Sequence, residues 1–271
     1  MKYRRIMASL CRIAVAIPGA LVLFFLTAPV LAVIPMSFGA AGPLQLIPDH
    51  PSFDQYSRFF SSPDWMTALW ISVQVALGTT CLATVFGVAA ALGLSRLSAR
   101  WRLLLDAVLI LPRIVPTIVF AVAAYSVFLK FHLVGSVFGL MLAHSVLAMP
   151  FVVVFVGSAL RGLDHSLEEA SRSLGANPAI TFFRVVLPQI RLSLIGSALF
   201  AFNISFDEVV VTLFISGVYS KTLPVKVWDA IQYEVTPILP AISTLVILTT
   251  LALLLPLLLL RQRLDTTAKH R

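Results

Sequence analysis

The fold of this chain is decided by residues 161–191, RGLDHSLEEASRSLGANPAITFFRVVLPQIR, the longest polar interval in a mostly apolar sequence. The 271 residues are 59% hydrophobic and 12% charged, whereas soluble domains have about 25% charged residues. A signal peptide before a soluble domain would not explain apolar runs that recur up to the C-terminus. The composition therefore predicts an all-α, polytopic membrane protein, with room for about six spans of roughly 20 residues.

The polar interval carries strong helix-boundary signals. Ser166-Leu167-Glu168-Glu169 has the spacing of a capping box, in which the first and last side chains each bond the other residue's backbone N–H. Gly175 stands where the end of a helix favours a left-handed residue, and Asn177-Pro178 suits the start of the next helix. Pro188 is expected to end that second helix. The interval thus predicts two short helices, at about 167–174 and 178–187, joined by a glycine turn.

The apolar runs divide into six expected spans within one transmembrane domain, residues 1–271. The spans lie at about 13–36, 65–94, 103–129, 133–157, 192–216 and 237–260. We expect the first span to be uncleaved, because its apolar core is longer than the roughly 7–15 residues of a signal peptide. The predicted outer loops are 37–64 and 217–236, and the predicted cytoplasmic loop is 158–191.

Residue patterns inside the spans and the first outer loop add local predictions. Gly78, Gly87 and Gly93, together with several alanines, predict close helix packing along the second span. Pro112 and Pro116 are expected to kink the third span. Aromatic residues recur near helical spacing between 53 and 60, which fits a short helix lying either on the membrane surface or on the protein.

The positions of the basic residues orient the spans. Cytoplasmic segments of short-looped membrane proteins carry an excess of Lys and Arg. With the N-terminus inside, fifteen basic residues fall in the inner segments: Lys2, Arg4, Arg5, Arg12, Arg96, Arg100, Arg102, Arg161, Arg172, Arg184, Arg191, Arg261, Arg263, Lys269 and Arg271. Four fall in the outer segments: Arg58, Lys130, Lys221 and Lys226. Both termini and the 158–191 loop are therefore expected in the cytoplasm, and the net charge of +8 reflects membrane topology rather than nucleic-acid binding.

The sequence lacks the motifs of an enzyme or a metal site. No stretch matches the phosphate-binding G-x-x-x-x-G-K-[ST], the zinc-binding H-E-x-x-H or the G-x-S-x-G nucleophile elbow. The five histidines are scattered, and Cys11 and Cys81 form no metal or disulfide pattern. We therefore expect no catalytic residue, no metal ligand and no cofactor bound by this chain. The energy for moving any solute has to come from a partner protein or from an ion gradient.

The first short helix and its turn form a candidate docking surface. Its residues are Leu167, Glu169, Ala170, Ser171, Leu174 and Gly175. Leu167, Ala170 and Leu174 fall on one face of the helix, and the small residues would let another backbone approach closely. Glu169 adds one charge that could pair with a basic residue of a partner. On the residues alone, an equally good interpretation is that Glu169 and Gly175 only cap and end the helix.

A second polar cluster lies in the predicted fifth span, at Asn203, Ser205, Asp207 and Glu208. Ionisable groups in a span cost about 2.5–3.5 kcal/mol each on insertion scales, and they usually face the interior of the bundle or a cavity. Asn203 and Asp207, at i and i+4, share a face of the helix, whereas Glu208 points elsewhere. The carboxylates could line the outer half of a pathway for a cationic solute. They could also be interfacial charges, or pair with Arg113, the one basic residue inside a predicted span.

Glu169-Ala170-Ser171, Gly175 and, after nine intervening residues, Val185-Val186-Leu187-Pro188 resemble the cytoplasmic EAA loop of bacterial ABC-importer permeases. The sequence departs from that pattern twice, with Ser for the second Ala and Val for the Ile. The resemblance implies that the loop forms a coupling helix, seated in a groove of a separate ATP-binding subunit. The candidate docking residues, with Leu187 and Pro188, would then pass the closure of that subunit to the spans.

The resemblance extends over most of residues 52–217 and is to the polyamine-type (spermidine/putrescine) permeases. LPRIVPTIVF and FNISFDEVVVTLFISG look like the third and fifth spans of that subfamily. Ile71 and Arg113 depart from it, the latter at a place that is usually uncharged. The resemblance implies a small polar solute, cationic or amine-containing. Similar permeases are also linked to aminophosphonates, opines and iron complexes, which remain alternatives.

A type I importer in a bacterial inner membrane is the assembly that the resemblance implies. Its other members would be two ATP-binding subunits that hold ATP and Mg, a second and homologous permease, and an extracytoplasmic solute-binding protein. The alternative from another class is a gradient-driven transporter or channel without an ATPase. That alternative predicts an inverted internal repeat, and the sequence has no clear repeat.

Overall fold

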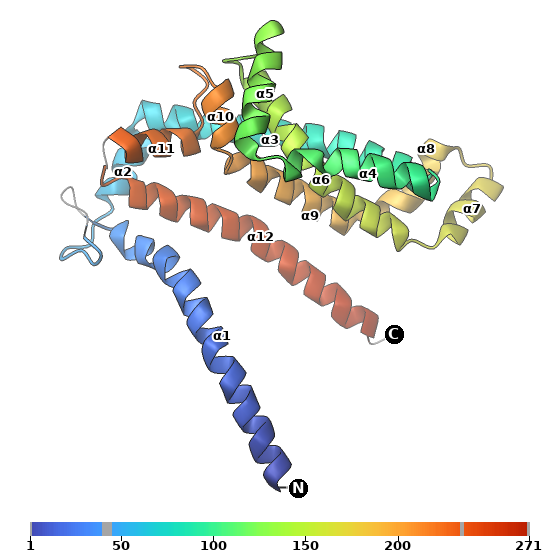
Figure 1. Ribbon diagram of the computed structural model, residues 1–271, viewed down its shortest axis with the longest axis horizontal. Coiled ribbons are helices and arrows are strands. Elements are labelled where there is room, and N and C mark those ends of the chain that lie inside the picture. Colours follow the sequence, from blue (N-terminus) through green and yellow to red (C-terminus); the bar gives the residue numbers. More distant parts are fainter. Residues whose placement is uncertain (1, 40–44, 234–235, 270–271) are drawn as a thin grey trace. The chain divides into compact units, whose positions relative to one another are not determined.

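The described part of the chain is helical, which confirms the all-α prediction. The computed structural model describes residues 2–39, 45–233 and 236–269, and no β-strand occurs among them (Figure 1). The chain divides into two compact units. The first contains Met1–Pro63 and Glu234–Thr249, and the second contains Asp64–Tyr233 and Thr250–Arg271.

The first unit holds α1 (Lys2–Met36), α2 (Asp54–Ser61) and the beginning of α12 (Leu239–Lys269). The hydroxyl oxygens of Ser37 and Tyr56 share a hydrogen bond of 2.7 Å, which ties α2 to the end of α1. Ring centroids lie 5.3–5.9 Å apart within an aromatic cluster of Phe38, Phe53 and Tyr56. Of the two interpretations of this short aromatic helix, the structure therefore supports the one in which it packs on the protein.

The second unit is built around α3 (Pro63–Ser95), α6 (Val137–Arg161) and α9 (Leu187–Phe206). A Cβ added at Gly87 would lie 2.7 Å from the Val152 side chain of α6, and one added at Gly78 would overlap Met141. The close packing predicted for Gly78 and Gly87 is confirmed, whereas the prediction for Gly93 is wrong, because a Cβ added there would meet no atom within 4 Å. Most of the buried side chains that form this core are small or β-branched. The buried residues are Ala83, Ala91, Ala148, Val152, Val156, Leu160, Val186, Ile190 and Ala201.

A second hydrophobic cluster joins α3 and α6 to α5 (Thr117–Lys130) and α10 (Val210–Ile215). Nearby, the N–H of Leu223, the first residue of α11 (Leu223–Tyr233), donates to Ser72 Oγ of α3 over 2.7 Å. Helix α11 was missed by sequence analysis, which predicted only an outer loop there. Figure 1 places α5, α10 and α11 at the opposite end of this unit from α7 (His165–Ser173) and α8 (Pro178–Thr181).

Four helices among the described residues are long and apolar enough to cross a membrane: Ala16–Met36, Pro63–Ser95, Val137–Arg161 and Pro178–Phe206. A fifth span is possible if α4 (Ala99–Ile114) and α5 are taken together, although they bend by 99° at the break between them. Pro116 explains this break, because it lacks an N–H and forces Val115 into an extended conformation. The predicted sixth span falls on α12, whose helix includes the apolar stretch Leu239–Leu253 and continues to Lys269. The structure thus supports a multi-pass protein with four to five spans in its described part.

Two predicted spans differ from the helices of the structure. The fourth span begins at Val137 rather than 133, because His132 and Gly135 adopt positive φ angles of 54° and 81° and form a turn. The fifth span is not continuous over 192–216. Its helix ends at Phe206, and a short break separates it from α10.

The polar interval follows the sequence prediction in part. Gly175 has a φ of +84°, and the Asn177 side chain accepts a hydrogen bond of 2.8 Å from the Ile180 N–H, so the glycine turn and the second N-cap are confirmed. The capping box is wrong. Asp164, not Ser166, caps α7, with its Oδ1 accepting from the Ser166 N–H over 2.9 Å.

The second helix also does not end at Pro188. A π-helical turn over Phe182–Val186 continues directly into α9, and the Leu187 N–H donates to the Phe182 carbonyl five residues earlier. Pro188 then falls in the first turn of α9, where the missing N–H of a proline costs little. Residues 178–206 therefore form one long apolar helix that begins at the polar turn.

Candidate functional site

The predicted docking residues lie together at one end of the second unit, on α7 and its turn (Figure 1). Leu167 is 47% exposed and Leu174 is 89% exposed, although both are apolar. Glu169 and Ala170 are exposed as well. A Cβ added at Gly175 would meet no atom within 4 Å. The five residues thus form a free surface of apolar, small and acidic groups, which we call the α7 surface.

The other three predicted members of this site have different surroundings. Ser171 is half-buried, and its hydroxyl shares a hydrogen bond of 3.1 Å with Thr181 Oγ1 of α8. Ser171 therefore holds α7 against α8 and does not belong to the exposed face. Leu187 is half-buried against the hydrophobic core, and Pro188 is exposed at the start of α9.

Behind α7 lies a hollow of about 410 Å³. Its polar side chains are Ser95, Arg96, Glu168, Glu169, Arg172 and Thr181. Arg172 forms an exposed ion pair of 3.5 Å with Glu168, one turn earlier on the same helix. An exposed pair of this kind contributes less than about 1 kcal/mol. The position of α7 therefore depends more on the Ser171 contact and the glycine turn than on charge pairing.

The polar cluster of the fifth span lies at the break after α9. Asp207 is the C-cap of α9 and is exposed, and its side chain makes no hydrogen bond or ion pair with the described residues. Glu208 is half-buried, and its Oε1 accepts a hydrogen bond of 3.0 Å from the Val211 N–H. Glu208 therefore caps α10, whereas Asp207 has a carboxylate that is free to meet a ligand.

The side chain of Asn203 forms its hydrogen bond with α12 and not with Asp207. Its Oδ1 accepts a long hydrogen bond of 3.5 Å from Thr250 Oγ1, while its backbone carbonyl accepts from the Asp207 N–H over 3.1 Å. This backbone bond keeps the predicted i, i+4 relation between Asn203 and Asp207 at the end of α9, and no hydrogen bond joins their two side chains among the described residues.

Arg113 is not paired with either carboxylate by an ion pair within the described residues. Its guanidinium carbon lies 4.3 Å from the centroid of the Phe151 ring, a cation–π contact between α4 and α6. The Phe151 ring lies 4.9 Å from Phe200 of α9, centroid to centroid. Arg113 is exposed, so its charge also remains accessible.

A buried histidine, missed by sequence analysis, holds the break in place. His144 of α6 is fully buried; its Nδ1 lies 2.9 Å from Ser205 Oγ of α9, and its Nε2 lies 3.1 Å from Thr212 Oγ1 of α10. Thr212 Oγ1 donates its own proton to the Glu208 carbonyl over 3.0 Å. A neutral ring then has one consistent arrangement: Nε2–H donates to Thr212, and Nδ1 accepts from Ser205. The imidazole thus links both sides of the break that carries Asp207.

His144→Phe is expected to destabilise the solubilised protein by about 1–3 kcal/mol, because it keeps the volume but leaves the Ser205 hydroxyl without its partner. His144→Gln should lose less stability than His144→Phe, since a side-chain amide can both donate and accept a hydrogen bond. Thermal unfolding of the purified variants measures both effects. Thr212→Val is the matched control: its effect should not add to that of His144→Phe, because both remove the same hydrogen bond. A His144→Phe variant as stable as the wild type would contradict this role.

With this geometry in place, comparison with known proteins identifies the family. Residues 83–270 match the family described as the inner membrane component of binding-protein-dependent transport systems. The chain belongs to this family. The matched residues include every predicted docking and pathway residue, from Arg113 to Glu208.

The permease is similar to permease proteins of several transport systems. It is 32% identical over 202 residues to the spermidine/putrescine transport system permease protein PotC of Haemophilus influenzae, covering 74% of this chain and 79% of that protein. It is 30% identical over 234 residues to the putrescine transport system permease protein PotI of Escherichia coli, covering 82% of each. A probable molybdenum ABC transporter permease of Haloferax volcanii is 34% identical over 171 residues, covering 60% of this chain and 63% of that one.

Solved structures share the fold of the permease. A bacterial ABC transporter that imports the acidic polysaccharide alginate superposes with a TM-score of 0.66 at 17% identity, covering 93% of this chain and 95% of that one. The MetNI methionine ABC transporter gives a TM-score of 0.54 at 18% identity, covering 72% and 95%. At these identities the likeness establishes the fold alone. The protein is thus a multi-pass membrane permease of the ABC-importer class.

Proposed function

We propose that this permease subunit forms part of the pathway of an ATP-driven importer and receives the work of a separate ATPase through the α7 surface. The observation that carries the proposal is the exposure of that surface, above all Leu174 at 89%, with open space at Gly175. Exposed apolar side chains beside a small residue suit a partner with a matching groove. Two copies of the partner, each holding ATP and Mg, would serve the assembly.

The proposed topology has six spans, with both termini and α7 in the cytoplasm. It rests on the distribution of basic residues along the sequence. A second, homologous permease would complete the pathway. An extracytoplasmic solute-binding protein would dock at the opposite end of the second unit, where Val218 and Tyr219 are 81% and 93% exposed.

The proposed solute is small, polar and amine-containing, of the polyamine type. Two observations support this class. The relatives PotC and PotI are named for spermidine and putrescine, and Asp207 offers an exposed carboxylate at a break within an apolar helix pair. A carboxylate without an intramolecular partner can accept charge-assisted hydrogen bonds from an ammonium group.

A solute that also carries an anionic group is the second candidate. Arg113 is exposed beside the Phe151 ring, and one relative is named as a probable molybdenum transporter permease. An aminophosphonate, an opine or an iron complex would use a guanidinium together with a carboxylate. Measuring which solutes the cognate binding protein holds would decide between the two classes.

Site-specific cross-linking tests the proposed assembly. A photo-reactive amino acid placed at Leu174 should capture an ATP-hydrolysing protein in native membranes, and one placed at Tyr219 should not. Tyr219 is the matched control, because it is equally exposed but lies in the segment between α10 and α11. A soluble solute-binding protein is the expected product there. Mass spectrometry of the cross-linked products identifies both partners.

A different result would favour a gradient-driven transporter. In that case the probe at Leu174 captures no nucleotide-hydrolysing protein, while uptake continues and is abolished when the ion gradient is dissipated. A partner that binds at both positions would instead overturn the assignment of α7 to a specific docking surface.

A further inference from the structure

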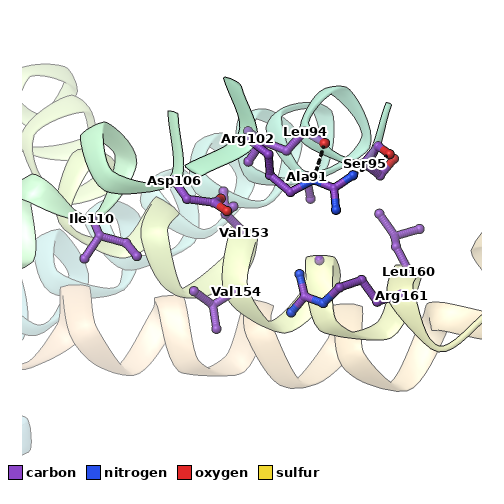
Figure 2. Close-up of a pocket in the computed structure, with 11 residues that line it drawn as sticks. Ala91, Leu94, Ser95, Arg102, Asp106, Ile110, Val153, Val154, Leu160 and Arg161 are labelled. Carbon is purple, nitrogen blue, oxygen red and sulfur yellow. Dashed lines mark hydrogen bonds between the residues drawn. The ribbon is translucent and has the colours of Figure 1, made fainter. Parts of the chain in front are cut away.

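A pocket of about 290 Å³ lies between α3, α4 and α6, near the α7 end of the second unit (Figure 2). One part of its wall is apolar, with Ala91, Leu94, Ile110, Val153, Val154 and Leu160. The other part is polar or charged, with Ser95, Arg102, Asp106 and Arg161. Figure 2 shows the Arg102 and Arg161 guanidinium groups on two sides of one space, with the Asp106 carboxylate beside it. The proposed docking and pathway residues are not among its lining residues.

The ends of the surrounding helices indicate that the pocket lies at the depth of lipid headgroups. It lies at the C-terminal ends of two apolar spans, α3 and α6, and at the first turns of α4. Trp101, next to Arg102, is 60% exposed, and Leu103 is 73% exposed. A tryptophan followed by exposed leucines marks the boundary between headgroups and hydrocarbon. The two arginines therefore lie at headgroup level near the helix ends, whereas Ile110, Val153 and Val154 line the pocket further along α4 and α6.

The charged groups of the pocket keep spare hydrogen-bonding capacity. Arg102 uses Nε for the Leu94 carbonyl at 3.0 Å and Nη2 for the carbonyls of Ser95 at 3.0 Å and Leu97 at 3.2 Å, which fixes its position and leaves Nη1. Arg161 and Asp106 form no ion pair with the described residues. Two guanidinium groups and one carboxylate thus share a small space without neutralising one another.

We propose that this pocket binds a zwitterionic phospholipid whose headgroup carries a phosphate and a primary ammonium. The phosphate is the acceptor for Arg161 and for the free Nη1 of Arg102, since guanidinium groups bind phosphate oxygens with paired donors. The ammonium is the donor to Asp106. The acyl chains follow the apolar wall. Basic pockets between spans commonly hold lipid headgroups, and the added carboxylate selects for a headgroup with its own positive charge. The proposal is independent of the transported solute.

The test uses the full chain, purified with the subunits that stay bound to it, in nanodiscs of defined composition. Native mass spectrometry counts the retained lipids. The wild type should retain phosphatidylethanolamine, which has a primary ammonium, in preference to phosphatidylcholine, whose trimethylated nitrogen has no N–H to donate. Arg161→Gln should lower retention of both lipids about tenfold, the loss of one charge-assisted contact of ~1.4 kcal/mol. Asp106→Asn should keep lipid bound but abolish the preference for phosphatidylethanolamine.

Arg191→Gln is the matched control, because Arg191 is exposed on α9 and does not line the pocket. Arg102 is left intact, since its loss would also remove the cap of α3. Inorganic phosphate and phosphoethanolamine, added without lipid, should not raise the unfolding temperature. Equal stabilisation by either would show a soluble-phosphate site and overturn the lipid assignment. Retention unaffected by Arg161→Gln, or an unchanged preference in Asp106→Asn, would overturn the proposal as well.

Discussion

Gly175→Asp is expected to abolish solute-stimulated ATP hydrolysis by the assembled importer, while the permease remains in the membrane. The aspartate has room in the chain itself, because a Cβ at this position meets no atom within 4 Å. The positive φ of 84° adds a strain of about 1–2 kcal/mol for an L-residue, less for aspartate than for most. The main loss is therefore at the surface of the partner, which would meet a bulky charge in place of a hydrogen atom.

Two controls separate docking from folding in this experiment. Gly175→Ala has at least as much backbone strain as Gly175→Asp but adds only a methyl group, so it should retain much of the stimulated ATPase activity. Gly162→Asp adds the same charge nearby, at a φ of −87° that any residue adopts, and should leave coupling intact. ATPase assays in proteoliposomes measure the three variants. Normal coupled transport by Gly175→Asp would refute the assignment of the α7 surface.

Asp207→Asn is expected to reduce uptake of a cationic solute by about tenfold or more, equivalent to at least ~1.4 kcal/mol of lost interaction. The substitution preserves shape and removes the charge. Asp207 is exposed and makes no side-chain hydrogen bond or ion pair with the described residues, so the fold should not depend on the charge. Radiolabelled uptake into vesicles gives KM and the maximal rate, and the level of assembled complex provides the normalisation.

Glu208→Gln is the matched control for Asp207→Asn. Its amide oxygen can still accept from the Val211 N–H and cap α10, as the native carboxylate does at 3.0 Å. Uptake by Glu208→Gln should therefore stay near that of the wild type. If both variants lose uptake equally, the net negative charge of the break matters rather than Asp207 itself. Unchanged kinetics in Asp207→Asn would remove it from the pathway.

Local signals in the sequence predicted much of the α7 region correctly. The left-handed Gly175 and the Asn177 N-cap are as expected, because each depends on a backbone conformation and a partner only a few residues away. The N-cap that the sequence predicts for α7 is wrong, since Asp164 and Ser166 are both good caps and lie only two residues apart. The helix end predicted at Pro188 is wrong because a π-helical turn shifts the hydrogen-bond register of the helix, so that a proline fits there.

The sequence alone determined that this is a helical, multi-pass membrane protein with an exposed polar turn between apolar helices, because hydropathy and capping act over short distances along the chain. The tertiary structure alone decided that Arg113 lies over Phe151, that Ser171 faces α8, and that His144 joins Ser205 and Thr212. The histidine and its partners are 61 and 68 residues apart in sequence. Such contacts depend on how helices pack against one another, and the periodicity of any one helix does not contain that information.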